Sequence, residues 1–85
     1  MKLAANVSYR KTENGLGMIY NKVEGTLFEL NETATSIIDL IVGNSELTAN
    51  GIADELAIVY EASLELIIEE VKDTISEFIE FGVLE

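Results

Sequence analysis

The chain has 85 residues, of which 48% are hydrophobic, and it contains neither cysteine nor histidine. This length fits one small domain whose stability has to come from packing, since no thiol is available for a disulfide or a metal site. Without histidine the most common general base is missing, which disfavours an enzyme. No apolar run approaches the roughly 20 residues that span a bilayer, and no signal-peptide pattern is found, so we expect a cytoplasmic protein.

Charge is distributed unevenly along the chain. Residues 1–31 carry four basic and three acidic side chains, a net +1, and residues 32–85 carry one lysine and thirteen acids, a net −12, which together give −11. Such a surface repels phosphate backbones and anionic lipids. It predicts a cationic or zwitterionic peptide, or a basic face of an enzyme, as the partner rather than nucleic acid or a membrane. The alternative is a solvated acidic surface that serves solubility alone.

The first thirty residues predict three short strands, because β-branched and aromatic residues alternate there with polar ones. The expected strands are Val7 to Lys11, Met18 to Asn21 and Thr26 to Leu30. Asn14-Gly15 and Glu24-Gly25 are typical of the turns between them.

After the third strand the hydrophobic period changes from two to 3.6 residues, which predicts helices. Asn31 is the expected N-cap of the first helix, and Gly43-Asn44 is its expected left-handed stop. The second helix should run from Thr48 to Tyr60, with a loose start at Asn50-Gly51. The third should open near Ser63 and end at Gly82. The expected buried stripes are Ala34, Ile37, Ile38 and Ile41; then Ile52, Ala53, Leu56, Val59 and Tyr60; and finally Leu64, Ile67, Ile68, Val71, Ile75, Phe78 and Ile79.

No group of side chains predicts chemistry. The carboxylates of Glu69, Glu70, Asp73 and Glu77 lack the irregular, glycine-containing loop of a calcium site, so we interpret them as a solvated helix face. No serine has a base in a suitable context, and no helix follows the glycines near residue 15 to bind a phosphate. We therefore expect no catalytic residue, no metal and no cofactor.

The junction Gly25-Thr26-Leu27-Phe28-Glu29-Leu30-Asn31-Glu32-Thr33-Ala34, followed by Ile37-Ile38 and Gly43, resembles the PqqD-like family. Further matches are Ile52-Ala53, Leu56, Tyr60, Glu70-Val71-Lys72-Asp73, Phe78 and Gly82-Val83-Leu84, so that the resemblance covers residues 6 to 84. It implies an α+β fold that is similar to the winged helix-turn-helix, with a three-stranded antiparallel sheet followed by three helices in a single domain, residues 1–85.

The resemblance also implies a function. Domains of this kind bind the leader of a ribosomally made precursor peptide as an added strand, and present it to a peptide-modifying enzyme. That enzyme is a radical SAM maturase, a leader peptidase or a cyclase. The third strand is the implied docking edge, and it shows no proline and only Glu29 as a charged guard. The sequence does not orient the backbone groups of Leu27 and Glu29 toward or away from this edge.

The third helix is the implied wall of the peptide groove. Its core stripe centres near Leu64, Val71 and Ile75, and the flank that we expect to face the peptide carries Ile67, Glu70, Thr74 and Phe78; Ile68, Lys72 and Ile79 form the other flank. The expected peptide-binding residues are Leu27, Phe28, Glu29, Leu30, Ile67, Glu70, Val71 and Thr74. The alternative for Ile67 and Phe78 is that they only close the core.

Two other classes of protein share some of these features. A winged-helix DNA-binding regulator needs a basic recognition helix, whereas the segment from Thr48 to Tyr60 contains Asp54 and Glu55 and no lysine or arginine. An acyl carrier protein is also short, acidic and helical. Its modified serine has only a distant counterpart here, Ala62-Ser63-Leu64, which lacks the preceding aspartate, and a carrier bundle has no strands.

Overall fold

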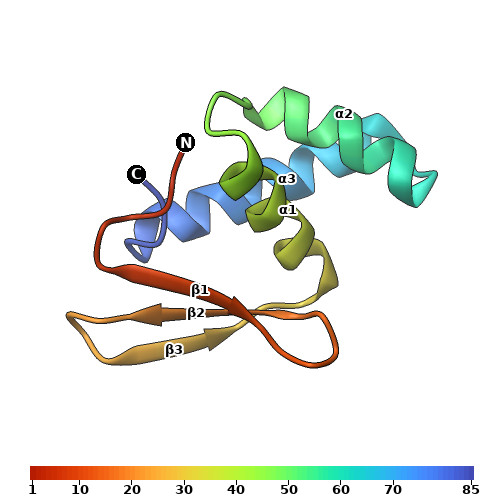
Figure 1. The fold of residues 1–85 in the computed structure, drawn as a ribbon. Helices are drawn as coiled ribbons and strands as arrows, with labels where there is room; N and C mark the ends of the chain where they lie inside the picture. Colours follow the sequence, from red (N-terminus) through yellow and green to blue (C-terminus); the bar gives the residue numbers. More distant parts are fainter.

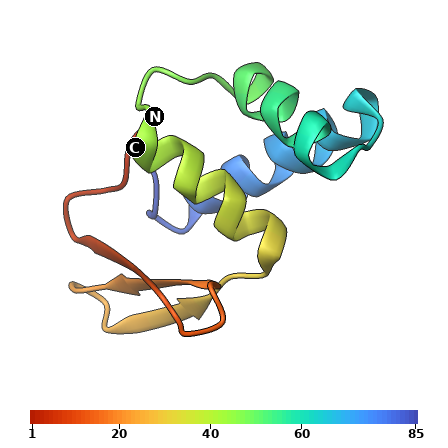
Figure 2. The ribbon, with the colours of Figure 1, turned by 45° about the vertical axis from the view of Figure 1, so that its right-hand side comes forward.

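Three antiparallel strands and three helices make up the computed structural model, which describes residues 1–85 (Figure 1). The elements are β1 (Val7–Lys11), β2 (Gly17–Asn21), β3 (Thr26–Glu29), α1 (Glu32–Gly43), α2 (Ala49–Tyr60) and α3 (Leu64–Glu80). The sheet order is β1-β2-β3, and the helices cover only one of its faces (Figures 1 and 2). The expected order of elements is confirmed, with ends that differ by one or two residues.

Two turns set the register of the sheet. Gly15 between β1 and β2 has a φ of +80°, and Gly25 between β2 and β3 has a φ of +72°, a region that side chains other than glycine disfavour. The second turn is held by Asn21, whose buried Oδ1 accepts the backbone N–H groups of Val23 at 3.0 Å and Glu24 at 3.1 Å. These contacts fix where β3 begins.

The helix ends follow the expected caps in all but one place. Asn31 Oδ1 accepts the N–H of Ala34 at 2.8 Å at the start of α1, and Gly82, with a φ of +74°, follows the end of α3. The expected left-handed stop at Gly43-Asn44 is wrong, because Asn44 is extended with a φ of −152°. Its side chain instead accepts the N–H of Glu46 at 3.1 Å, a local turn that directs the chain toward α2.

The core lies between the sheet and the helices and is built around isoleucines, with Ile19, Ile37, Ile38 and Ile52 fully buried. Three residues expected in the helical stripes are exposed instead: Val59 by 71%, Leu64 by 47% and Ile79 by 55%. Val59 and Leu64 lie at the far end of the α2–α3 hairpin, beyond the reach of the sheet (Figure 1). Ile79 lies in the last turn of α3, which is longer than α2 and extends past it.

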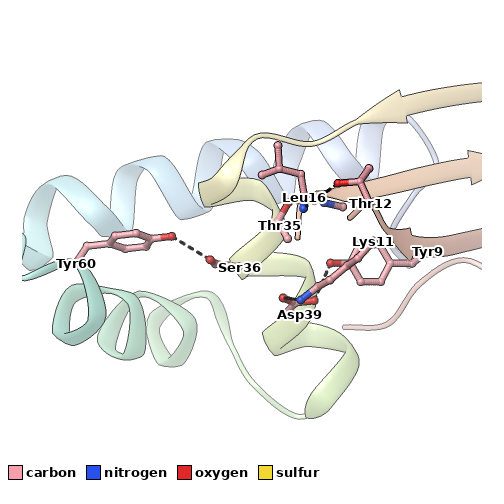
Figure 3. A network of polar contacts seen from close by, with 9 residues as sticks. Tyr9, Lys11, Thr12, Leu16, Thr35, Ser36, Asp39 and Tyr60 are labelled. Carbon is pink, nitrogen blue, oxygen red and sulfur yellow. Dashed lines mark hydrogen bonds and ion pairs between the residues drawn. The ribbon is translucent and has the colours of Figure 1, made fainter. Parts of the chain in front are cut away.

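A polar cluster joins the first strand to α1 (Figure 3). The hydroxyl of Tyr9 donates to Asp39 Oδ1 at 2.6 Å, and Lys11 Nζ lies 2.6 Å from Asp39 Oδ2. Burial, and then the hydrogen bond and negative charge of Asp39, raise the pKa of Tyr9 well above its ordinary value, so the hydroxyl remains a donor. The cluster anchors the sheet against the helical layer.

A second polar contact in this region is buried and can be tested. The N–H of Gly17 donates to Thr35 Oγ1 at 2.8 Å, so Thr35→Val leaves a buried donor without an acceptor. We expect this variant to lose about 1–3 kcal/mol of unfolding free energy, measured by urea denaturation. Thr35→Ser keeps the oxygen and should lose less. Equal losses in the two variants would show that the hydrogen bond contributes nothing.

The two ends of the chain lie side by side (Figure 1). Leu3 and Leu84 form an isolated antiparallel bridge, and the N–H of Ala4 donates to the carbonyl of Val83 at 2.9 Å. This pairing fixes the segment after α3 and places Val83 and Leu84 in the core. No helix combines the length and the apolar character needed to cross a membrane.

Candidate peptide-binding groove

The free edge of β3 presents unpaired backbone groups. The N–H of Leu30 donates to the carbonyl of Gly17 at 2.8 Å, so the backbone of Leu30 faces β2. Hydrogen-bonding direction alternates along an antiparallel strand, which means that Phe28 also faces β2. The N–H and C=O groups of Leu27 and Glu29 therefore point out of the sheet, a direction that the sequence alone left open.

A groove of about 240 Å³ lies beside this edge, between β3 and α3. Residues from β3, from the start of α1 and from α3 with the segment after it line the groove: Phe28, Glu29, Leu30, Asn31, Thr33, Ala34, Glu70, Thr74, Glu77, Phe78, Phe81 and Val83. The edge and the groove are thus one continuous surface. A strand placed on β3 has its alternate side chains directed into the groove.

The α3 wall of the groove is a single row of side chains. Glu70, Thr74, Glu77 and Phe78 stand at i, i+4, i+7 and i+8, which places them on one side of the helix. Just beyond α3, the ring of Phe81 lies 5.8 Å from that of Phe28, centroid to centroid, at an interplanar angle of 40°. This aromatic pair closes one end of the groove.

The structure separates the expected site residues into three groups. Phe28, Glu29, Leu30, Glu70 and Thr74 line the groove. Ile67 and Val71 lie in the core beneath the wall, exposed by only 8% and 1%. The side chain of Leu27 lies outside the groove and lines a shallow hollow with Tyr20 and Met18, while its backbone forms part of the open edge.

Glu77 in α3 and Phe81 just beyond it line the groove but were not among the residues expected on this flank. Both follow an expected member of the flank by seven residues, Glu70 and Thr74 respectively, which is close to two full helical turns. This seven-residue spacing is the sequence feature that could have indicated both residues. Glu77 had been assigned only to the solvated acidic face.

The charged residues that line the groove are all acidic. Glu70 and Glu77 belong to α3 and Glu29 to the edge strand, and no lysine or arginine lines the groove. The two ion pairs of the structure lie elsewhere, Lys2 with Glu85 and Lys11 with Asp39. No three acidic side chains converge closely enough to hold a metal ion. The groove therefore offers main-chain hydrogen bonding, an aromatic end and negative charge.

Comparison with known proteins identifies the family. The family model described as coenzyme PQQ synthesis protein D (PqqD) matches residues 17–84. The chain belongs to the PqqD family. The resemblance noted from the sequence is thus confirmed for most of the chain, while a search of curated proteins finds no significant match.

Two solved structures share the fold of this PqqD-family chain. "TbiB1 in Complex with the TbiA(beta) Leader Peptide" has a TM-score of 0.87 and 18% identity, covering 100% of this chain and 95% of that one. "Lasso peptide synthetase B1 complexed with the leader peptide" has a TM-score of 0.86 and 19% identity, covering 99% and 95%. The expected fold class, a three-stranded antiparallel sheet followed by three helices, is confirmed.

Proposed function

We propose that this PqqD-family chain binds the leader of a ribosomally made precursor peptide as a strand added to β3, and presents it to a peptide-modifying enzyme. The observation that carries the proposal is the open edge of β3, where the backbone groups of Leu27 and Glu29 point outward and the groove adjoins the strand at Glu29. In strand addition, main-chain hydrogen bonds supply affinity, and pockets for alternate side chains supply selectivity. Both elements are present on one surface.

The comparisons support the proposal. Family membership covers the strand edge and the helical wall alike, and both similar structures are complexes with leader peptides. We propose that the chain acts as a single domain without a cofactor or a catalytic residue of its own. Its enzyme partner is a radical SAM maturase, a leader peptidase or a cyclase.

Each expected site residue has a proposed role in this arrangement. Leu27 and Glu29 bind the leader through their backbone. Phe28, Leu30, Glu70 and Thr74 contact the leader side chains that point into the groove, together with Glu77, Phe78 and Phe81. Ile67 and Val71 support the wall from the core.

The surface gives no support to DNA binding by either of the two helices that form the hairpin. α2 carries Asp54 and Glu55 without a basic residue, and α3 carries Lys72 as its single base among six acids. Phosphate contacts require lysine or arginine at the interface. Duplex DNA therefore serves as the negative control for the binding experiment below.

The test is a titration of the isotope-labelled chain with a synthetic leader, followed through its amide signals. The leader is that of a precursor peptide that we expect to be encoded by a small open reading frame beside the gene of this chain. Amide shifts should concentrate in residues 26–31 and 66–75, and extend to Glu77, Phe78 and Phe81. Shifts that cluster on residues 48–60, or a lack of binding, would refute strand addition at β3. Duplex DNA should cause no shifts.

A further inference from the structure

We propose that the groove selects leaders that carry lysine or arginine at the positions facing α3, an inference that rests on the proposed function. Glu70 and Glu77 both line the groove and are both exposed. Glu77 follows Glu70 by seven positions, which places their backbones about 10 Å apart along the same row. Neither carboxylate takes part in an ion pair of the structure.

The chain has no basic side chain of its own that neutralises these two acids. Its five basic residues are Lys2, Arg10, Lys11, Lys22 and Lys72. Lys2 and Lys11 pair with acids outside the groove, and Arg10 and Lys22 line the hollow on the uncovered face of the sheet. Lys72 follows Glu70 by two residues, so it lies about 200° around the helix, on the opposite side. A basic side chain of a bound peptide would therefore meet two carboxylates that have no ion-pair partner within the chain.

The Phe28–Phe81 pair lies toward one end of the groove and Glu70 toward the other. The C-terminal part of α3 lies over the start of β3 (Figures 1 and 2), where Phe81 and Glu24 line one hollow. Glu70 stands eleven residues earlier, roughly 16 Å along α3 toward the end of β3. Side chains of the leader therefore meet aromatic rings at one end of the groove only, and acidic residues along its length.

The distances along α3 predict how the basic residues are spaced in the leader. Groove-facing side chains of an added strand recur about every 6.7 Å, or every second residue. Glu77 lies roughly 6 Å before Phe81 along the helix axis, and Glu70 roughly 16 Å before it. For the antiparallel pairing, which is the more stable one, basic residues stand two and four positions ahead of an apolar residue at the Phe28–Phe81 end. The side chain of lysine or arginine is long enough to span the remaining distance to the carboxylates, while its apolar stem packs on the phenylalanine rings.

The experiment selects binders from an mRNA-displayed library of random 12-residue peptides with three forms of the chain. These are the wild type, Glu70→Lys/Glu77→Lys, and the matched control Glu65→Lys/Glu69→Lys, which makes the same change in net charge at two exposed residues of α3 that lie outside the groove, about 220° and 260° around the helix from Glu70. Wild type and control should enrich lysine and arginine two and four positions before an apolar residue. The groove variant should lose this preference or exchange it for acids.

A selected peptide gives the quantitative measurement. Replacing its two basic residues with glutamine should weaken binding to the wild type about tenfold at low salt, and by less in 0.5 M NaCl. Peptides that shift the amides of Leu27 and Glu29 without any basic preference would overturn this inference and leave the proposed function standing. A control variant that changes the preference as much as the groove variant would also overturn it. If no peptide binds at the edge, both proposals fail.

Discussion

Proline at position 29 is expected to weaken leader binding by roughly 10- to 100-fold, whereas alanine at the same position should change it only a few-fold. The N–H of Glu29 points out of the sheet, and in the proposed complex it donates to a carbonyl of the leader. Proline removes this donor and leaves the carbonyl of the leader without a partner at a newly covered edge. Binding is measured by calorimetry with the synthetic leader.

Comparing Glu29→Pro with Glu29→Ala separates the loss of the backbone N–H from the loss of the side chain. Both remove the carboxylate of Glu29, and only Glu29→Pro removes the N–H. The native sheet should survive, because this N–H makes no bond to β2 and an edge strand tolerates proline at such a position; circular dichroism checks it. Leu27→Pro and Leu27→Ala repeat the comparison at the other outward position. If proline and alanine bind the leader equally well at both positions, the leader does not pair with β3.

Features that depend on neighbouring residues could be predicted from the sequence. Asn31 caps α1 because its side chain reaches the N–H of Ala34, three residues away. Gly15 and Gly25 form the turns because each adopts a positive φ by itself. Helical periodicity likewise grouped Glu70, Thr74 and Phe78 on one flank of α3, although it could not decide which flank borders the groove.

Features that depend on distant parts of the chain could not be predicted. Periodicity placed Val59 and Ile79 on apolar faces, yet it carries no information about where the neighbouring layer ends. The bridge between Leu3 and Leu84 joins opposite ends of the chain, and no local pattern signals it. Likewise, the backbone N–H and C=O of Glu29 point outward because of how β3 pairs with β2, where Glu29 lies opposite Met18. The groove could not be predicted for the same reason, because one end of it depends on the contact between Phe28 and Phe81, which are far apart in the sequence.

The second large effect is expected in the core, where Ile37→Ala should cost about 2–5 kcal/mol of unfolding free energy. Ile37 is fully buried in α1, between the sheet and the other helices, so its truncation leaves a cavity. The total free energy of unfolding of a domain is only about 5–15 kcal/mol. Val42→Ala is the control on the same helix, because Val42 is 56% exposed and should lose less than about 0.5 kcal/mol. Urea denaturation measures both variants.

The destabilised variant also separates binding from folding. A ligand that binds only the native state adds RT ln(1 + [L]/Kd) to stability, about 2.7 kcal/mol at a hundredfold excess over Kd. The leader should therefore restore much of the loss in Ile37→Ala, because the open edge of β3 and the groove do not include Ile37. In the double variant Ile37→Ala/Glu29→Pro the leader should restore little. Equal restoration in the two would mean that the leader stabilises the chain from a surface other than the β3 edge.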